Sequence, residues 1–140
     1  MKTTQRTMGQ MTRRMIVQYA GVVQDFNPVH YDEQFARAAG LPNVIAQGPL
    51  TVALALDALV AEHGSTSIRS LSFRLKSPVF PGDTIYARTT VTDVRASKSR
   101  PNQGIVTTKT EGYKADGTVF LSFERVSLVP RRGAGVKAAR

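Results

Sequence analysis

The segment from Pro49 to His63 constrains the fold more than any other part of the sequence. Ten of its fifteen residues are Leu, Val or Ala, and they are spread around the whole circumference of the expected helix. A helix on a protein surface shows one apolar stripe, so this helix is expected to be buried on most of its sides. Proline at the first helical position and Gly64 after the last one favour these boundaries.

Strands with alternating apolar side chains are expected after this helix, over residues 67–77, 84–96, 104–114 and 118–129. In the last of them Val119, Leu121 and Phe123 share one phase, whereas Val126 and Leu128 take the opposite one, which indicates a β-bulge near residue 124. A curved antiparallel sheet wrapped around the buried helix satisfies both features and predicts an α+β fold. Its exposed edge strand could be covered by a second chain.

The basic residues are concentrated at the two ends of the chain. The net charge is +9, but residues 1–14 and 131–140 each carry +4, so the part between them is nearly neutral. We expect residues 1–11 and 131–140 to be disordered ends, and residues 12–130 to form a single domain. Nucleic-acid binding is not indicated, because such a domain concentrates basic residues on its folded face.

Several classes of site are disfavoured by composition. The chain has no cysteine and only two histidines, so thiolate chemistry is excluded and no metal or other cofactor is expected. No apolar run reaches the length of about 20 residues that a membrane span needs, so no membrane association is expected. The N-terminus has no apolar segment typical of a secretory signal, and a cytoplasmic protein is therefore expected.

The loop Asp25-Phe26-Asn27-Pro28-Val29-His30 is the strongest candidate for a catalytic segment. It follows a helix expected from Thr12 to about Gln24. Pro28 fixes its own φ and restricts the preceding residue, while Asn27 can hydrogen-bond within the turn. Such a stiff loop could direct the carboxylate of Asp25 and the imidazole of His30 at one water molecule, as general acid–base catalysis requires.

Three blocks of the sequence resemble the MaoC-like, R-specific 2-enoyl-CoA hydratases. The loop block includes the flanking Tyr19-Ala20 and Phe35-Ala36. Residues 45–51, Ile-Ala-Gln-Gly-Pro-Leu-Thr, are similar to a block that the family usually writes as I-A-H-G-M-L. Residues 73–83 are similar to its F-x-x-P-V-x-x-G-D strand and turn. Together these blocks extend the resemblance over about residues 12–130.

The resemblance implies a hot-dog fold, in which an antiparallel sheet wraps around a central helix. It also implies reversible hydration of a trans-2-enoyl-CoA to a (3R)-3-hydroxyacyl-CoA, a lyase reaction of fatty acid metabolism. The expected partners are an acyl thioester of coenzyme A or of acyl carrier protein, and a second hot-dog chain in a homodimer or heteromer.

The resemblance and the chemistry together assign roles to individual residues. Asp25 and His30 would share the acid and base roles, and the Gly48 N–H would hold the thioester oxygen at the positive end of the helix. Contacts to the substrate are expected around these groups and along the next strand, from Asn27, Gln47, Pro49, Leu50, Arg74 and Lys76. The two basic residues in this set could meet coenzyme A phosphates.

Two positions depart from the family pattern and keep other functions open. Gln47 stands where the family usually has histidine, and Leu56 stands where some members have a serine that helps to hold the catalytic pair. One alternative is a subunit of a heteromeric complex with little activity alone. Another is a hot-dog acyl-CoA thioesterase, in which a carboxylate would activate water on the carbonyl without a need for His30.

Overall fold

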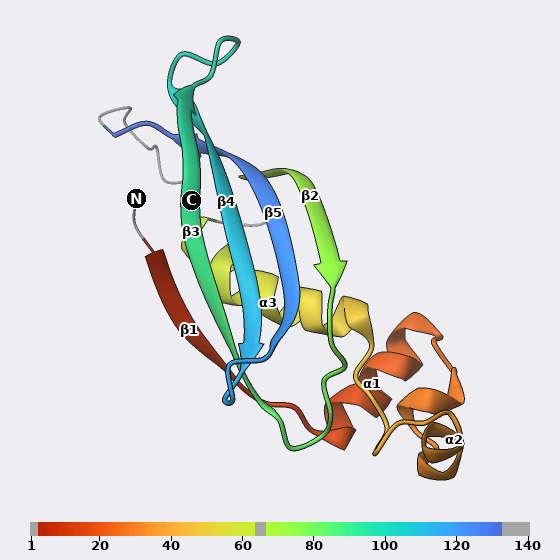
Figure 1. Ribbon diagram of the computed structural model, residues 1–140. Helices are drawn as coiled ribbons and strands as arrows, with labels where there is room; N and C mark the ends of the chain where they lie inside the picture. The colour runs from red at the N-terminus through yellow and green to blue at the C-terminus, as the bar shows by residue number, and fades with distance from the viewer. Residues whose placement is uncertain (1–2, 64–66, 133–140) are drawn as a thin grey trace.

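A five-stranded antiparallel sheet forms the larger layer of the protein, seen in a computed structural model that describes residues 3–63 and 67–132 (Figure 1). The strand order is β1-β3-β4-β5-β2, so β1 and β2 form the two edges. The strand bounds are β1 Thr3–Gln10, β2 Ile68–Leu75, β3 Thr84–Ala96, β4 Gln103–Lys114 and β5 Val119–Pro130. The end expected to be disordered, 131–140, lies outside the described residues from position 133 onward.

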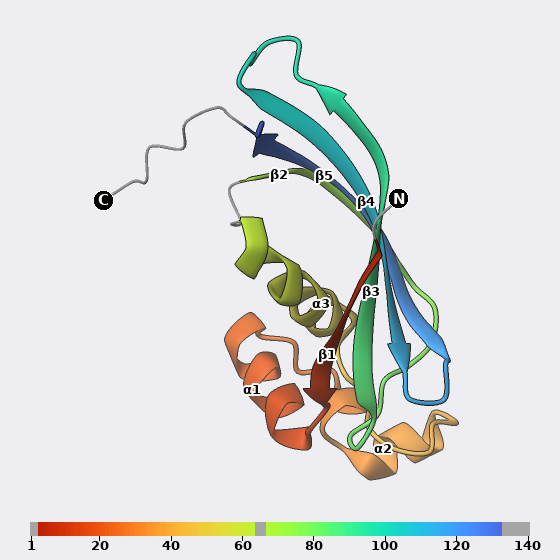
Figure 2. The same cartoon turned by 90° about the vertical axis from the view of Figure 1, so that its left-hand side faces the viewer.

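The helix α3 (Gly48–His63) lies against the concave face of this sheet, as its apolar composition predicts (Figure 2). The helices α1 (Arg13–Val23) and α2 (Glu33–Ala38) and the short 3-10 helix η1 (Pro28–His30) gather at one end of α3. Residues from α1, α3 and the inner sides of the strands form one core, with these fully buried members: Met11, Ile16, Ala55, Ile85, Phe120 and Leu121. In the described part of the chain no helix has the length and hydropathy needed to cross a membrane.

The strand β1 corrects the expectation of disorder over residues 1–11. Its polar sequence has no apolar period, but its backbone pairs with the open side of β3, from Thr3 opposite Thr90 to Gln10 opposite Thr84. A register shift between Thr7 and Gly9 marks a bulge, and Gly9 has φ +93° there, a conformation that favours glycine. Main-chain pairing does not depend on side-chain type, and it therefore orders a segment whose sequence predicted disorder.

The register of β5 corrects the expectation of a bulge near residue 124. Its pairing with β4 runs without a shift through Phe123, Glu124 and Arg125, and its pairing with β2 does the same. The alternation that begins at Leu121 therefore continues, and it places Arg125 and Ser127 on the concave side. Both are buried, with 4% and 3% of their surface exposed.

Candidate active site

The end of α1 sets the position of the first candidate residue. Thr12 caps the helix by accepting a hydrogen bond from the Met15 N–H at 3.2 Å, as its sequence position predicts. At the other end Gln24 takes a left-handed conformation with φ 59°, and the Asp25 N–H donates to the Ala20 carbonyl at 3.1 Å. This closure of the last turn starts the loop at Asp25.

Asn27 and Pro28 fold the loop that follows. The Asn27 side chain accepts from the Val29 N–H at 3.2 Å, and the Asn27 N–H donates to Asp25 Oδ1 at 3.3 Å. Pro28 is the first residue of η1, where its missing N–H leaves no hydrogen bond unmade. The side chain of Asn27 is thus committed to the turn, which supports its expected role as a loop-former.

His30 is held from the side of the ring that faces away from Asp25. Its Nδ1 lies 2.7 Å from the carbonyl oxygen of Ile45, and the Ile45 N–H donates to the Val29 carbonyl at 3.1 Å. The residue is 9% exposed, so this hydrogen bond fixes the ring within a nearly dry setting. The segment that leads into α3 is thereby joined directly to the loop.

Asp25 and His30 form the contact that their spacing predicted. His30 Nε2 lies 3.3 Å from Asp25 Oδ2, and the side chains are 10% and 38% exposed respectively. The Ile45 carbonyl can only accept, so Nδ1 carries a hydrogen. Nε2 then faces the carboxylate of Asp25, a group that accepts hydrogen bonds. The pair therefore places an imidazole nitrogen beside a carboxylate that is open to solvent.

Gly48 begins α3 three residues after the carbonyl that holds His30. The first N–H groups of a helix have no partner within the helix, and the helix dipole makes this end attractive to negative charge. The Gly48 carbonyl is engaged by the Thr51 hydroxyl at 2.6 Å. The side chain of Leu75, at the end of β2, lies directly over the glycine, where a Cβ at position 48 would overlap its Cδ1 atom. Any larger residue at position 48 would therefore make the Leu75 side chain move.

Gln47 links α1 to the start of α3. It is 1% exposed, and its Nε2 donates to the Ile16 carbonyl at 2.9 Å, which also identifies the remaining amide atom as Oε1. Within the described residues that buried Oε1 atom has no hydrogen-bond partner. The residue was expected to contact the substrate, and the structure gives it a positioning contact between two helices.

Two further residues expected at the substrate lie at the first turn of α3. Leu50 is 7% exposed and belongs to the core, so its side chain packs inward. Pro49 is exposed next to Gly48 and has no N–H to donate. At this turn the backbone is therefore the polar surface that a ligand could meet.

Arg74 and Lys76 are not brought to the Asp25–His30 pair. Arg74 on β2 is paired with Ser122 on β5. Its side chain points to the outer face of the sheet, whereas those of the preceding residue and of Leu75 point to the inner face. There it lines a hollow of about 170 Å³ with the residues Ser72, Lys109, Ser122, Phe123 and Glu124. Lys76 follows the end of β2, and its N–H donates to the Phe120 carbonyl at 2.9 Å. Arg74 therefore lies on the face of the sheet opposite to α3.

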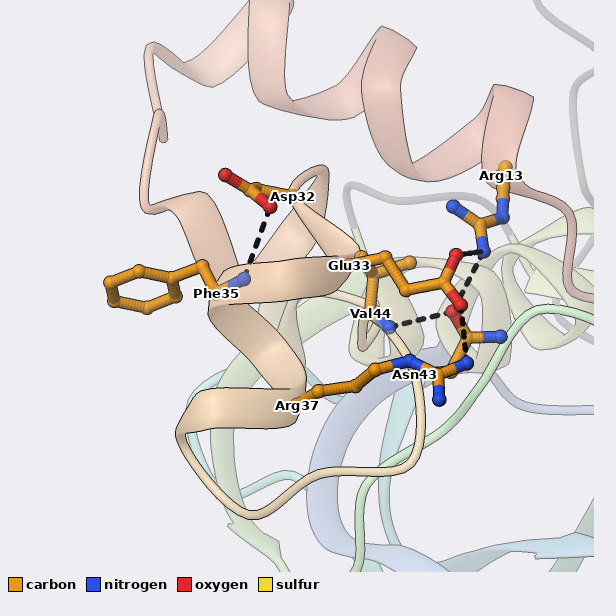
Figure 3. A network of polar contacts seen from close by, with 7 residues as sticks. All are labelled: Arg13, Asp32, Glu33, Phe35, Arg37, Asn43 and Val44. Carbon is orange, nitrogen blue, oxygen red and sulfur yellow. Dashed lines mark hydrogen bonds and ion pairs between the residues drawn. The ribbon is translucent and has the colours of Figure 1, made fainter.

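A set of ion pairs braces the helices behind the loop (Figure 3). Glu33 forms an ion pair with Arg13 of α1 and another with Arg37 of its own helix, each at 2.7 Å. Arg13 also donates a hydrogen bond to Asn43 Oδ1 at 2.8 Å. Hydrogen bonds from Arg37 and then Arg13 hold the pKa of the Glu33 carboxyl below its ordinary value. The Asp32 side chain caps α2 at the Phe35 N–H. The network ties α2 to α1 and so supports the loop between them.

Sequence reasoning missed Ile45 and Leu75. Ile45 acts through its carbonyl, which every residue has, so no side-chain pattern could identify it. Leu75 was assigned to an ordinary strand phase, and its place over Gly48 depends on how β2 crosses the start of α3. Among the described residues there is no cluster of three or more histidines and carboxylates that could hold a metal ion.

Comparison with known proteins gives consistent matches over most of the chain. The (R)-specific enoyl-CoA hydratase of Aeromonas caviae is 32% identical over 120 residues, which cover 82% of this chain and 84% of that protein. The mitochondrial 3-hydroxyacyl-acyl-carrier-protein dehydratase FERN of Solanum lycopersicum is 27% identical, over 82% of this chain and 68% of that protein. Other relatives are longer, and the chain spans 32% of the mesaconyl-CoA hydratase of Cereibacter sphaeroides.

The fold comparison agrees with the sequence matches. The unliganded R-hydratase PhaJ1 of Pseudomonas aeruginosa superposes with a TM-score of 0.78 at 25% identity, covering 93% of this chain and 81% of that one. This structure and that of the (R)-hydratase from A. caviae have the hot-dog fold, which agrees with the sheet wrapped around α3. The family described as "MaoC like domain" matches residues 1–114. The chain therefore belongs to the MaoC-like domain family and has its hot-dog fold.

Proposed function

We propose that this protein catalyses the reversible addition of water to the double bond of a trans-2-enoyl thioester, giving a (3R)-3-hydroxyacyl thioester. The observation that carries the proposal is the Asp25–His30 pair, whose facing atoms lie 3.3 Å apart and whose imidazole is held by the Ile45 carbonyl beside the start of α3. The printed names of its relatives, which are hydratases and dehydratases, support the same class of reaction.

The proton balance of the reaction suits such a pair. Water attacks C3 of the enoyl group, one of its protons passes to the pair, and the pair returns a proton to C2. The more exposed carboxylate of Asp25 is the group that water reaches, while the buried imidazole of His30 relays the proton. The protonation of the pair is restored at the end of each turnover, so no cofactor is consumed.

Gly48 is proposed to stabilise the negative charge on the thioester oxygen. Its N–H lies at the positive end of α3, and a helix N-terminus suits an oxyanion. Removing one such donor typically raises a reaction barrier by ~2.7–4 kcal/mol. The Leu75 side chain that covers this glycine would move aside or pack against the bound thioester.

The test is the loss of the conjugated enoyl absorbance when purified protein is added to crotonyl-CoA and to longer trans-2-enoyl-CoAs. The proposal expects absorbance to fall to a hydration equilibrium, and chiral analysis to identify the (3R) product. Release of free thiol in place of hydration would favour the thioesterase alternative. Absence of any turnover with coenzyme A and acyl carrier protein substrates, alone or with a second chain, would refute the enzymatic proposal.

A subunit of a heteromeric complex is the second candidate. The edge strand β2 presents Phe73 and Leu75 with 46% and 52% of their surface exposed, which favours coverage by another chain. Leu56 also lacks the hydroxyl that some family members use beside their catalytic pair. A related fold occurs in the ChsH1–ChsH2 complex of Mycobacterium tuberculosis, at 22% identity. Activity that appears only on co-expression with a second hot-dog chain would favour this candidate.

A further inference from the structure

Three polar side chains lie together on the concave face of the sheet, beside the apolar core. Arg125 and Ser127 lie two residues apart on β5, and Thr108 on β4 is directly opposite Arg125. Opposed residues in an antiparallel pair point to the same face, so the three side chains are neighbours. Their exposed fractions are 4%, 3% and 5% respectively. We refer to Thr108, Arg125 and Ser127 as the inner polar cluster.

Two hydroxyl groups of this cluster are buried and have no partner in the part of the chain that the structure describes. They are Thr108 Oγ1 and Ser127 Oγ. Nearby, the hydroxyls of Thr89 and Thr110 satisfy each other at 2.7 Å, so the sheet does pair such groups where it can. Buried polar atoms are nearly always hydrogen-bonded, so a cluster of exceptions needs an explanation, and a bound molecule that supplies the missing partner is one.

An apolar strip connects the start of α3 with this cluster. Leu75, Phe73 and Leu71 alternate on the inner side of the edge strand β2, and Phe73 is opposite the core residue Phe123. Leu75 lies over Gly48, and Leu71 is directly opposite Arg125. Leu75 and Phe73 remain about half exposed. Four residues of strand separate the two ends, so the strip is about 13 Å long.

We propose that the acyl chain of the substrate carries an oxygen-bearing polar group that binds to the inner polar cluster. This inference rests on the proposed function, because it assumes that the thioester oxygen is held at Gly48. The apolar part of the acyl chain then follows Leu75, Phe73 and Leu71, and the oxygen meets the hydroxyls of Thr108 and Ser127. Arg125 has five N–H donors and can serve the substrate oxygen in addition to the contacts that it already makes.

The chemistry of the cluster defines the class of group. Hydroxyls donate and accept, and the guanidinium only donates, so the complementary group is an oxygen acceptor. A terminal hydroxyl or a terminal carboxylate on a medium-length acyl chain supplies such an oxygen. A methyl end would leave Thr108 and Ser127 unpaired and would gain nothing from Arg125.

The test compares three trans-2-enoyl-CoAs of equal medium chain length that end in a hydroxyl, a carboxylate or a methyl group. We expect kcat/KM to be roughly tenfold higher for one or both oxygen-bearing substrates than for the methyl-ended one. The two oxygen-bearing arms distinguish a hydroxyl from a carboxylate. Replacing Thr108→Val together with Ser127→Ala should bring the ratio close to one.

Thr107→Val is the matched control, since Thr107 precedes Thr108 on the same strand and faces the outer side. It should keep the wild-type ratio. Equal kcat/KM of the wild-type protein for all three substrates, with normal turnover of crotonyl-CoA, would overturn this inference and leave the proposed function intact. Failure to hydrate any thioester would count against the proposed function itself.

Discussion

Asp25 offers the most direct test of the proposed chemistry at the scale of single residues. Asp25→Asn keeps the size of the side chain but removes the carboxylate that lies 3.3 Å from His30 Nε2. We expect kcat for enoyl-CoA hydration to fall by about 10²–10⁴-fold, the usual contribution of a positioned acid or base, with thermal stability nearly unchanged. Steady-state kinetics and thermal unfolding measure the two effects.

Asp32→Asn serves as the control for that substitution. Asp32 is an acid only a few residues away, but its role is to cap α2 at the Phe35 N–H, and asparagine caps equally well. The control should retain wild-type kinetics. A pair that acts as a unit also predicts that Asp25→Asn combined with His30→Gln is little worse than either change alone. Additive losses would mean that the two groups act separately.

Gly48 provides a second prediction at the same scale. In Gly48→Ala the new Cβ overlaps Leu75 Cδ1, but that leucine is half exposed and can turn aside at modest cost in stability. The methyl group remains beside the N–H that is proposed to hold the thioester oxygen. We expect kcat/KM to fall by roughly 10²-fold, which approaches the loss of an oxyanion donor.

The double change of Gly48→Ala with Leu75→Ala separates these two effects. Removing the leucine relieves the overlap, so the stability lost in the single glycine variant should be recovered relative to Leu75→Ala alone. Turnover should remain low, because the obstruction to the substrate is still present. Recovery of turnover in the double variant would show that packing, rather than an oxyanion contact, makes Gly48 necessary.

The sequence predicted the part of the candidate site that consists of side chains, but not the part that consists of main-chain atoms. Asp25, Asn27 and His30 were identifiable because a proline-stiffened loop with an acid and an imidazole has few purely structural uses. The Ile45 carbonyl that orients His30 was not, since main-chain atoms leave no trace in residue types. The contact of Arg74 with the substrate stays a prediction, since the period of a strand places this residue on the outer face of the sheet but does not show where a coenzyme A phosphate would lie.

At the scale of elements, the ion pairs between α1 and α2 predict a specific dependence of stability on pH. Arg37 and Arg13 hold the pKa of Glu33 below its ordinary value of 4.5, so the folded protein prefers the charged carboxyl. That contribution is present above the unfolded pKa and is lost as the pH falls through the folded pKa. The difference in unfolding free energy between wild type and Glu33→Gln should therefore shrink as the pH drops from 7 to 3.

Urea unfolding at a series of pH values measures this difference. Since all three side chains are substantially exposed, the effect should be small and should weaken further in high salt. A difference that stays constant down to pH 3 would show that Glu33 contributes by packing or helix propensity and not by its charge.

The elements themselves show where sequence patterns stop being informative. The helix α3 follows from its high apolar content on all sides, and the strands β3 to β5 follow from apolar periodicity, which is strong where a strand faces a core. The strand β1 was missed because an edge is ordered largely by main-chain pairing and its side chains are polar. The inward phase of Arg125 and Ser127 was misjudged for the opposite reason, because apolar periodicity assumes that inner positions are apolar.

At the scale of the whole molecule, the two edges of the sheet differ in a way that predicts assembly through β2. The inner side of β2 exposes Phe73 and Leu75, whereas β1 carries mainly Thr and Gln. Pairing of β2 with the same strand of a second chain would satisfy its open backbone and cover both apolar side chains next to Gly48. We expect a dimer at micromolar concentration by sedimentation or by light scattering after size exclusion.

Phe73→Lys tests which edge is used, because a charge on an edge strand opposes pairing with another chain. It should shift the protein toward monomer, whereas Val94→Lys should leave the dimer intact although Val94 is 66% exposed on β3. If the strip from Leu75 to Leu71 holds the acyl chain beneath that interface, the monomeric variant should also lose affinity for long substrates more than for crotonyl-CoA. A Phe73→Lys protein that remains fully dimeric would place the interface elsewhere on the sheet, because a buried lysine opposite Phe123 could not be accommodated without a partner charge.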